Sequence, residues 1–409
     1  MSAYTGYVNL KYRLKPTDVV CEFYVEPAKG SGLSVKDAAE RVAAESSIGT
    51  WTDVPNTKKH LAAQVFRIQG NDIRVAYHHE LFEDGNIPQL LSSVAGNIFG
   101  MKELNNLRLN DIEIPQLYTR SFRGPAFGVE GIRKIIKVPR RPLLGTIVKP
   151  KLGLTAFEHS RVAYQAWKGG IDIVKDDENL TNQVFNRFKE RVNETLKLRE
   201  KVERDTGERK IYMPNITAET NEMINRAKFV KAAGGEYLMV DVFTCGFSAV
   251  QALRDADLGL IIHGHRAGHA AFTRNPKHGI SMAVMCKLLR LAGVDQLHVG
   301  TGVGKMIETE EEVERNVEAS QGKWHGVKAM MCVSSGGLNP LDIPALVKLY
   351  GNDIVIQMGG GIHSHKEGTT AGARAARQAL DAVLAKKSLK EYAKKHHELK
   401  VAIDQFGKK

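Results

Sequence analysis

The segment Gly169–Asn179, which reads GGIDIVKDDEN, constrains the fold of this chain more strongly than any other. Its IDIV run is rich in β-branched residues and follows a glycine pair, which predicts a short buried strand. The strand ends in Lys175-Asp176-Asp177-Glu178, so three carboxylates and a lysine share one terminus. Because side chains alternate along a strand, we expect Lys175 and Asp177 on the same side.

This charged terminus predicts a metal site, although the lysine complicates the prediction. Carboxylate oxygens at this density suit Mg²⁺ better than zinc or copper. An ammonium group repels a cation, so Lys175 is expected to be a neighbour of the site, a proton carrier, or a group modified into an anion. The alternative for the whole stretch is a solvated run of charges at a strand–loop junction.

Strand-like and helix-like patterns alternate from Leu143 onward. Helix signals separate the strands, such as the Thr155/Glu158 capping box and an apolar stripe at Phe185, Phe188, Val192 and Leu196. Eight buried strands with intervening helices predict an α/β (β/α)₈ TIM barrel, with a doubly wound parallel sheet as the alternative. The expected strands are residues 143–148, 171–174, 210–216, 237–243, 258–264, 294–299, 327–333 and 353–358.

The first part of the chain has a different pattern. Strand-like segments at Val19–Pro27 and Val65–Glu80 flank an amphipathic helix at Ser34–Ser47, which predicts a smaller α+β N-terminal domain. A basic connector, Lys134–Pro142, leads into the barrel. We therefore expect an α+β domain at residues 1–125, a catalytic barrel at 126–385 and a helical tail at 386–409.

The net charge of +12 is compatible with nucleic-acid binding, with an anionic substrate, or with solubility alone. The sequence has no zinc-finger or RNP signature and no apolar stretch as long as a membrane span, so we expect neither a nucleic-acid nor a membrane partner. No apolar signal-peptide core is present at the N-terminus. The four cysteines lie far apart, which indicates reduced thiols and a cytoplasmic location.

Polar residues and glycines follow nearly every expected strand, whereas the strand interiors carry almost none. In a barrel the active site lies at the carboxyl ends of the strands. Each residue alone also fits a structural role, since a lone buried histidine or a glycine pair is common in any fold. The residues at the strand ends are Lys149, Lys151, Lys175, Asp177, Glu178, Asn215, Asp241, His263, His265, Arg266, His269, His298, Lys305, Ser335, Gly336, Gly337, Gly359 and Gly360.

These residue types predict a small substrate with two phosphates. Asp177 and Glu178 suit a divalent cation. Glycine-rich loops after the last two strands expose backbone N–H groups to one phosphate, and Arg266 and His298 suit a second. The segment GTGVGKM lacks the GxxxxGK[ST] spacing of a nucleotide-binding loop, so a nucleoside triphosphatase is not expected.

These motifs, taken in order, resemble the large subunit of ribulose-1,5-bisphosphate carboxylase/oxygenase (Rubisco). GTIVKPKLGL, GGIDIVKDDEN, HGHRAGHAAF, HVGTGVGKM, SSGG and QMGGG resemble its barrel loops, and AAESSIGTW and AGNIFGMKEL resemble its N-terminal domain. The resemblance spans nearly the whole chain. The short length and the ending GGGIHSHKEGTTAGARAA are most similar to the archaeal form III group.

The resemblance implies Mg²⁺-dependent carboxylation of D-ribulose 1,5-bisphosphate by CO₂ to two 3-phosphoglycerate, with oxygenation by O₂ as a side reaction. An activating CO₂ would convert Lys175 into a carbamate, which resolves the lysine problem, and the reaction would pass through an enediolate. Metal ligands would be the Lys175 carbamate, Asp177 and Glu178, and catalytic residues would be Lys149, Lys175, His265 and Lys305. Substrate-binding residues would be Glu45, Thr50, Trp51, Asn97, Lys151, Arg266, His298, Ser335, Gly336, Gly337, Gly359 and Gly360.

The same resemblance implies a homodimer as the minimal unit, because Glu45 and Asn97 would reach a neighbouring subunit's site. Higher assemblies of dimers are compatible with it, and no small subunit is expected. Form III resemblance also implies a role in nucleotide ribose salvage or in a phosphoribulokinase-fed pathway. The alternative is a Rubisco-like enolase or isomerase of another phosphorylated sugar, which the complete residue set argues against. Met306 and Ile307 depart from the family pattern after the loop lysine.

Overall fold

The computed structural model describes residues 4–50, 52, 54, 57–303 and 308–407. Contacts divide the chain into two compact units. The first contains Met1–Arg123, Gly268–Ala292 and Trp324–Val327, and the second contains Gly124–Ala267, Gly293–Lys323 and Lys328–Lys409. No helix among the described residues has the length and apolar character needed to cross a membrane.

The first unit is built on a five-stranded sheet in the order β10-β4-β1-β3-β2. The central strand β1 pairs antiparallel with β3 and β4, and β10 runs parallel to β4. The strand-like segments expected within residues 65–80 form the hairpin β2–β3, where Gly70 adopts a left-handed conformation (φ +59°) and reverses the chain. Only the end of the range differs, since His79–Leu81 is a turn of 3₁₀ helix. Strands are β1 (Val19–Pro27), β2 (Gln64–Gln69), β3 (Asp72–Tyr77), β4 (Leu104–Glu113) and β10 (Gly279–Ile280).

Helix α1 packs on this sheet and confirms the helix predicted between Ser34 and Ser47. Ser34 and Asp37 form the capping box, and Ala38, Ala39 and Val42 are buried. The helices of this unit are α1 (Val35–Glu45), η1 (Lys59–Leu61), η2 (His79–Leu81), α2 (Ile87–Val94), η3 (Asn97–Gly100), α3 (Gln116–Thr119), α10 (Ala270–Thr273) and α11 (Met282–Ala292).

The second unit is a barrel of eight parallel strands in the order β7-β6-β5-β13-β12-β11-β9-β8. A parallel bridge between Asn215 and Met239 joins the two outer strands, β7 and β8. All eight strands predicted from the sequence are present, which confirms the barrel and excludes the doubly wound sheet. They are β5 (Leu143–Ile147), β6 (Ile173–Lys175), β7 (Ile211–Met213), β8 (Tyr237–Asp241), β9 (Ile261–His265), β11 (Gln296–His298), β12 (Met331–Ser335) and β13 (Ile354–Gln357).

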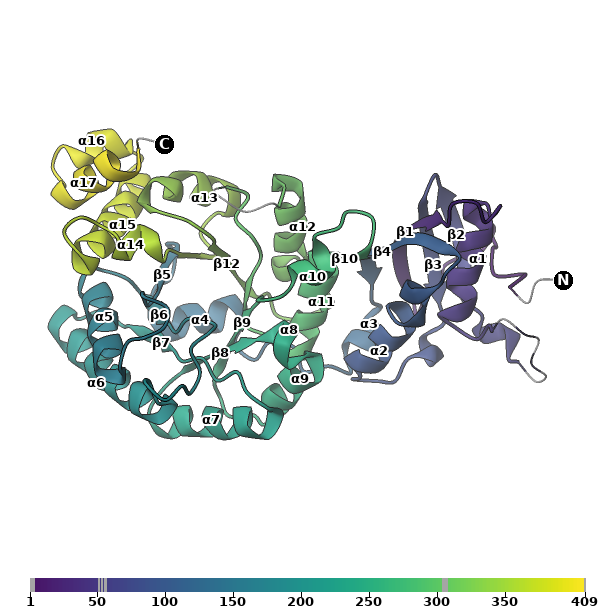
Figure 1. Cartoon of the computed structure of the whole chain (residues 1–409), viewed down its shortest axis with the longest axis horizontal. Helices are drawn as coiled ribbons and strands as arrows, with labels where there is room; N and C mark the ends of the chain where they lie inside the picture. Colours follow the sequence, from purple (N-terminus) through teal and green to yellow (C-terminus); the bar gives the residue numbers. More distant parts are fainter. Residues whose placement is uncertain (1–3, 51, 53, 55–56, 304–307, 408–409) are drawn as a thin grey trace. The chain divides into compact units, whose positions relative to one another are not determined.

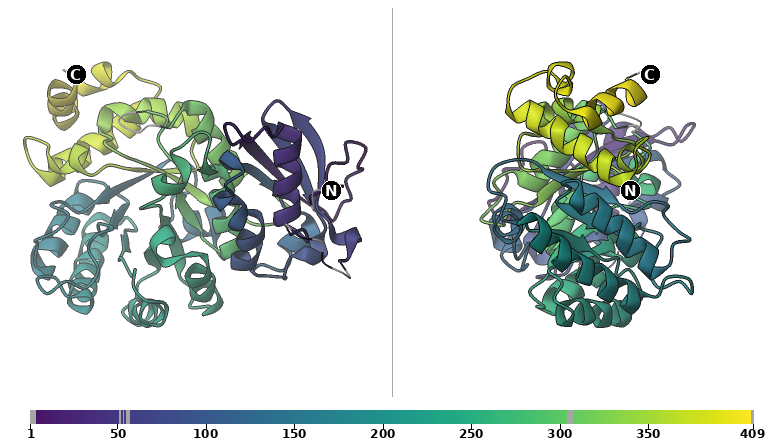
Figure 2. Two further views of the ribbon diagram at one scale, coloured as in Figure 1. Left: turned by 45° about the vertical axis from the view of Figure 1, so that its right-hand side comes forward. Right: turned by 90° about the vertical axis from the view of Figure 1, so that its left-hand side faces the viewer.

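Helices surround these strands (Figures 1 and 2). The Thr155/Glu158 capping box begins α5 as predicted, and Gly169 ends it. The predicted stripe is wrong at Phe185, which precedes α6 and is exposed, whereas Phe188, Val192 and Leu196 are buried. The helices of this unit are α4 (Gly128–Ile136), α5 (Ala156–Lys168), α6 (Phe188–Thr206), α7 (Thr220–Ala232), α8 (Val242–Cys245), α9 (Phe247–Asp255), α12 (Glu310–Gln321), η4 (Pro340–Asp342), α13 (Ile343–Tyr350), α14 (Gly360–His363), α15 (Thr369–Leu384), α16 (Leu389–Ala393) and α17 (His397–Phe406).

The barrel interior changes character along its axis. Ile132 and Ile136 of α4 pack against the first residues of several strands, such as Leu143 and Tyr237, and form an apolar core at the amino end. The expectation of nearly apolar strand interiors is wrong further along, where His263, Gln296 and Gln357 are buried within strands. The Gln296 amide lies 2.8 Å from Nδ1 of His263, so partners inside the barrel compensate part of the burial cost.

Candidate active site

Lys175 is the last residue of β6 and its side chain is 1% exposed. Its Nζ donates to the backbone oxygen of Asp176 at 2.8 Å and lies 3.2 Å from Sδ of Met239. The nearest carboxylate oxygen shown for it is Oε2 of Glu178, at 3.5 Å. The amine therefore sits inside the barrel with one longer ionic contact, and the carboxylates of Asp177 and Asp241 also lie near enough to act on its charge.

Burial lowers the pKa of Lys175, and it does so against the carboxylates of Glu178 and Asp177, which raise it. The pKa falls because burial removes water, and the charged ammonium loses more solvation than the neutral amine. A larger fraction of the side chain is thus a neutral amine, which has the free electron pair that a nucleophile or base requires.

Asp177 and Glu178 lie beside this lysine at the carboxyl end of the barrel. Oδ2 of Asp177 accepts a hydrogen bond from Nζ of Lys149 at 2.7 Å, and this pairs the ends of β5 and β6. Burial alone raises the pKa of Glu178, but the charges of Lys175 and His265 outweigh it and hold the pKa at about 2. An ionised carboxylate next to a second one provides hard oxygen donors, and this donor set fits Mg²⁺.

Asp176 points the other way and was not predicted as a functional residue. It is fully buried between the barrel and its helices, where it accepts from Nε of Arg191 at 3.0 Å and from the Tyr212 hydroxyl at 2.7 Å. Nε2 of His159 lies 3.1 Å from Oδ1. Although burial raises the pKa of Asp176, the Arg191 charge keeps it below its usual range. The alternation expected for Lys175 and Asp177 is therefore confirmed.

His265, at the end of β9, is oriented by two carboxylates. Its Nδ1 lies 2.7 Å from Oδ1 of Asp241, and its Nε2 lies 3.7 Å from Oε2 of Glu178. Asp241 ends β8, and its position at a strand end was the sequence signal for it. The two contacts place the imidazole next to the charged end of β6, where it can exchange a proton with a bound molecule.

A second polar group lies on β9, β11 and β12. Nδ1 of His298 is 2.7 Å from Oγ of Ser335, and Nε2 of His298 is 3.0 Å from Nε2 of His263. Burial lowers the pKa of His298 well below its ordinary value, and the neighbouring His265, His263, Lys175 and Arg266 lower it further. His298 is therefore neutral near pH 7, with ring nitrogens committed to hydrogen bonds.

Arg266 follows β9 and is 6% exposed. Its Nη2 donates to Oε1 of Glu308 at 2.6 Å, an ion pair that sequence reasoning missed because the partners lie 42 residues apart. The guanidinium is the natural anion ligand of this group, since its planar fork matches a phosphate.

Glycines complete the carboxyl end of the barrel at β12 and β13. Gly336 and Gly337 have φ values of +127° and +71°, which L side chains rarely adopt. A Cβ at Gly359 would lie 3.1 Å from Cε of Lys149, so a side chain there would crowd the lysine. A Cβ at Gly360 would meet nothing within 4 Å, which leaves backbone accessible there.

The structure thus brings together Lys149, Lys175, Asp177, Glu178, His265, His298, Ser335 and Gly359, with Arg266 beside them. Lys151 lies in the exposed loop after β5. Glu45, Thr50 and Asn97 belong to the other unit. Trp51, Lys305, Met306 and Ile307 lie outside the described residues.

Comparisons with known proteins agree over nearly the whole chain. The model of the ribulose bisphosphate carboxylase large chain catalytic domain matches residues 128–406, and that of its N-terminal domain matches residues 6–118. The ribulose bisphosphate carboxylase of Methanosarcina barkeri is 50% identical over 98% of this chain and 99% of its own length.

Solved structures give the same result. Octameric Rubisco from Pyrococcus horikoshii, crystallised with sulfate, has a TM-score of 0.95 and 46% identity, covering 99% of this chain and 97% of that chain. The dimeric archaeal Rubisco of Hyperthermus butylicus has a TM-score of 0.92 and 42% identity, covering 99% and 100%. The predicted resemblance to archaeal proteins of this kind is confirmed.

Proposed function

Because the chain belongs to the ribulose bisphosphate carboxylase large-chain family and is a carboxylase, we propose that it joins CO₂ and one water to D-ribulose 1,5-bisphosphate, breaks the C2–C3 bond of the sugar and releases two 3-phosphoglycerate. The observation that carries the proposal is the end of β6, where a buried lysine with a lowered pKa lies beside two carboxylates. We propose oxygenation of the same substrate by O₂ as a side reaction.

Activation is proposed to begin at Lys175. Its neutral Nζ attacks CO₂, an N–C bond forms, and one amine proton leaves, so that the lysine becomes a carbamate anion. The low pKa favours this step because only the neutral amine has a free electron pair. The change also removes the positive charge that would repel a cation. Asp177, Glu178 and the new carbamate would then hold Mg²⁺.

When bound, Mg²⁺ supplies a Lewis acid that polarises a carbonyl oxygen of the substrate. The carbamate of Lys175 takes the proton from C3 of the sugar, which gives the enediolate that attacks CO₂. Lys149 holds and returns protons near this intermediate and protonates the final carbanion, with His265 and Lys151 supporting the reacting group. Lys305 is proposed to stabilise the new carboxylate.

The two phosphates are proposed to bind at opposite sides of the barrel end. Arg266, His298 and Ser335 hold one of them together with sugar hydroxyls, which is supported by the 2.7 Å contact between His298 and Ser335. The other binds at Gly336, Gly337, Gly359 and Gly360, with Thr50 and Trp51.

We further propose that Glu45 and Asn97 complete the site of a neighbouring subunit, so that the homodimer is the smallest active form. Relatives with dimeric and octameric assemblies support a homo-oligomer built from dimers. The absence of a small subunit is part of the proposal. The division at residues 125 and 385, the cytoplasmic location, and a role in nucleotide ribose salvage or a phosphoribulokinase-fed pathway belong to the same proposal.

The test is incorporation of radiolabelled bicarbonate into acid-stable product with purified protein, Mg²⁺ and ribulose 1,5-bisphosphate. Incorporation into 3-phosphoglycerate should rise after preincubation with CO₂. No incorporation by folded, Mg²⁺-loaded protein would contradict the proposal and favour an enolase or isomerase of another phosphorylated sugar.

A further inference from the structure

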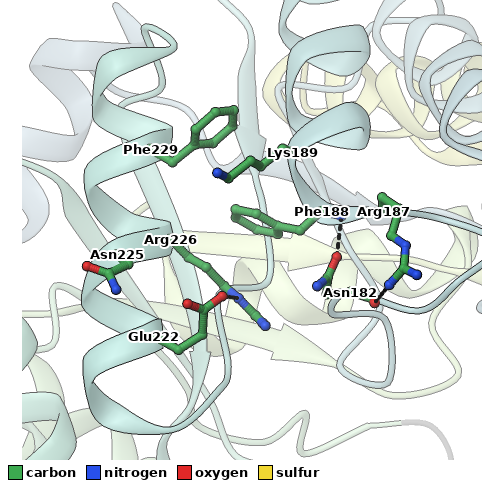
Figure 3. A pocket seen from close by; sticks show the side chains of 8 residues that line it. All are labelled: Asn182, Arg187, Phe188, Lys189, Glu222, Asn225, Arg226 and Phe229. Carbon is green, nitrogen blue, oxygen red and sulfur yellow. Dashed lines mark hydrogen bonds and ion pairs between the residues drawn. The ribbon is translucent and has the colours of Figure 1, made fainter.

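Polar side chains that take no part in the proposed reaction lie both outside and inside the barrel. Outside, a pocket between α6 and α7 is lined by two phenylalanine rings, and cations already cover both of them. The Arg226 guanidinium lies 5.5 Å from the Phe188 ring centre, and Nζ of Lys189 lies 5.4 Å from that of Phe229 (Figure 3). Inside the barrel, buried polar side chains instead form a row that ends at the candidate active site.

This row consists of four side chains from β11, β9 and β12. Nε2 of Gln296 lies 2.8 Å from Nδ1 of His263, whose Nε2 lies 3.0 Å from Nε2 of His298. Nδ1 of His298 lies 2.7 Å from Oγ of Ser335. Gln296 and His263 are fully buried, whereas Ser335 is the last residue of β12 and is partly exposed. An unbroken row of hydrogen-bonding groups thus connects the barrel interior to the carboxyl end.

The hydrogen positions along this row depend on one another. Two ring nitrogens 3.0 Å apart hold one hydrogen between them, so if Nε2 of His263 donates, Nε2 of His298 accepts. A neutral imidazole has one N–H, so His298 then carries its hydrogen on Nδ1 and donates to Ser335. Burial lowers the pKa of both histidines well below the ordinary value, so both rings are neutral near pH 7. The orientation of the Gln296 amide therefore decides every donor up to Ser335.

The surroundings of the Gln296 amide favour one of its two orientations. With its nitrogen toward His263, the amide donates to Nδ1, and the same nitrogen lies 3.9 Å from Sδ of Met213, a weak acceptor. Oε1 is buried and has no partner among the described residues. Turning the amide over would place the oxygen beside the sulfur and leave two buried N–H donors unpaired in place of one acceptor. Gln296 is therefore the donor to His263.

We propose that Gln296 and His263 are positioning residues that make His298 the donor to Ser335, so that the Ser335 hydroxyl hydrogen is directed to the substrate. This inference rests on the proposed function, in which His298 and Ser335 bind one phosphate and sugar hydroxyls. Because Oγ of Ser335 accepts from His298, its own O–H remains to donate to an acceptor such as a phosphate oxygen. Both nitrogens of His298 are occupied, so His298 acts on the substrate through Ser335.

The hydrogen positions are tested by neutron diffraction from crystals of the whole protein exchanged into D₂O, without substrate. We expect hydrogen or deuterium on Nε2 of His263 and on Nδ1 of His298. Its presence on Nδ1 of His263, on Nε2 of His298 or on both nitrogens of either ring would overturn the proposal. This measurement does not depend on activity. A protein that fixes no CO₂ would contradict the proposed function, and the neutron result would still decide this inference.

Gln296→Met tests the effect on the substrate without adding a charge. A thioether can accept weakly but cannot donate, so the row should reverse and Ser335 should donate to His298 instead of to the substrate. The KM for ribulose 1,5-bisphosphate should rise about fivefold or more, with kcat within about threefold, because a contact made equally in the bound and transition states is lost. Gln357→Met is the matched control, since Gln357 is a second buried glutamine of the barrel whose amide has no partner among the described residues. It should leave KM within about twofold.

A second comparison asks whether Gln296 acts through Ser335. In a Ser335→Ala background the hydroxyl is absent, so Gln296→Met should change KM by less than about twofold. A purely structural role of Gln296 would raise KM equally in both backgrounds. That result, or an unchanged KM in Gln296→Met alone, would overturn the proposal.

Discussion

Two neighbouring aspartates directly after β6 point to opposite faces of the barrel wall and have different kinds of partner. On the outer face, Asp176 is bound by Arg191, which is fully buried, and by the buried hydroxyl of Tyr212. On the inner face, Asp177 is bound by Lys149, whose side chain is 33% exposed, and by Asn179 of its own loop. Asp176 therefore has partners that cannot leave without unfolding, whereas a ligand can replace those of Asp177.

This contrast explains how the end of one short strand can anchor the loop that follows it and also carry the residues of the proposed reaction. Asn215 contributes to both faces, since its backbone N–H binds Asp176 and its side-chain amide donates to the backbone oxygen of Glu178 at 2.9 Å. The buried partners on the outer face fix the strand end. The inner face is then free to carry a buried amine and ionised carboxylates, which are costly for stability and useful for catalysis.

The largest expected effect comes from Lys175→Ala on the inner face. CO₂ fixation should fall by at least about 10³-fold, since the proposed base and one metal ligand are lost together. The variant should still fold with a cooperative urea transition, but the unfolding midpoint should fall, because the lost side chain leaves a cavity and removes the charge that Glu178 faces. Lys168→Ala, at an exposed lysine of α5, is the control and should change neither quantity. Normal carboxylation by Lys175→Ala would refute the carbamate assignment.

On the outer face, Asp176→Asn should lower stability instead. It leaves Arg191 buried without its carboxylate, so the free energy of unfolding should fall by about 3–5 kcal/mol in urea titration. Asp177→Asn is the matched change on the inner face and should cost less than about 1 kcal/mol, because its partner Lys149 can turn to solvent. Equal losses of unfolding free energy in the two variants would show that the partners of Asp176 and of Asp177 stabilise the protein to the same extent.

The sequence predicted the features that arise from local residue patterns and missed those that arise from contacts between residues far apart in the chain. The eight strands were predicted because each has a local apolar run, and the inner-face residues because strand ends converge in a barrel. Strand β4 was missed, since its three asparagines weaken the strand pattern. The role of Asp176 was missed because His159, Arg191 and Tyr212 lie 15 or more residues away and only packing brings them together.

The polar barrel interior was missed for a similar reason. Gln296 and His263 lie in strands that otherwise read as apolar, and they bind each other across neighbouring strands. Nothing local in either strand indicates that pairing. The grouping of α11 with the first unit is equally non-local, because Ser281 before it donates to the backbone oxygen of Asn110 in β4.

The pH dependence of activation tests the inner face alone. Burial lowers the pKa of Lys175, and only the neutral amine reacts with CO₂. At fixed dissolved CO₂ and below that pKa, the initial rate of activation should rise about tenfold per pH unit. The rate should level off below about pH 10.4, which is the pKa of an exposed lysine. A rate that still rises tenfold per unit above that pH would contradict a lowered pKa.

The smallest expected effect lies at Phe188, which supports the outer face from the helix side. Its ring lies between two guanidinium groups, 5.6 Å from Arg191 and 5.5 Å from Arg226. Phe188→Leu keeps an apolar side chain but removes both cation–π contacts, so the free energy of unfolding should fall by about 1–2 kcal/mol. Phe185→Leu, three residues earlier and 41% exposed, should change it by less than about 0.5 kcal/mol. Because neither ring contacts the inner face, the kcat for CO₂ fixation should stay within about twofold in both variants. A larger loss of kcat in Phe188→Leu, at temperatures where the variant is fully folded, would show that the outer face does more than hold the strand.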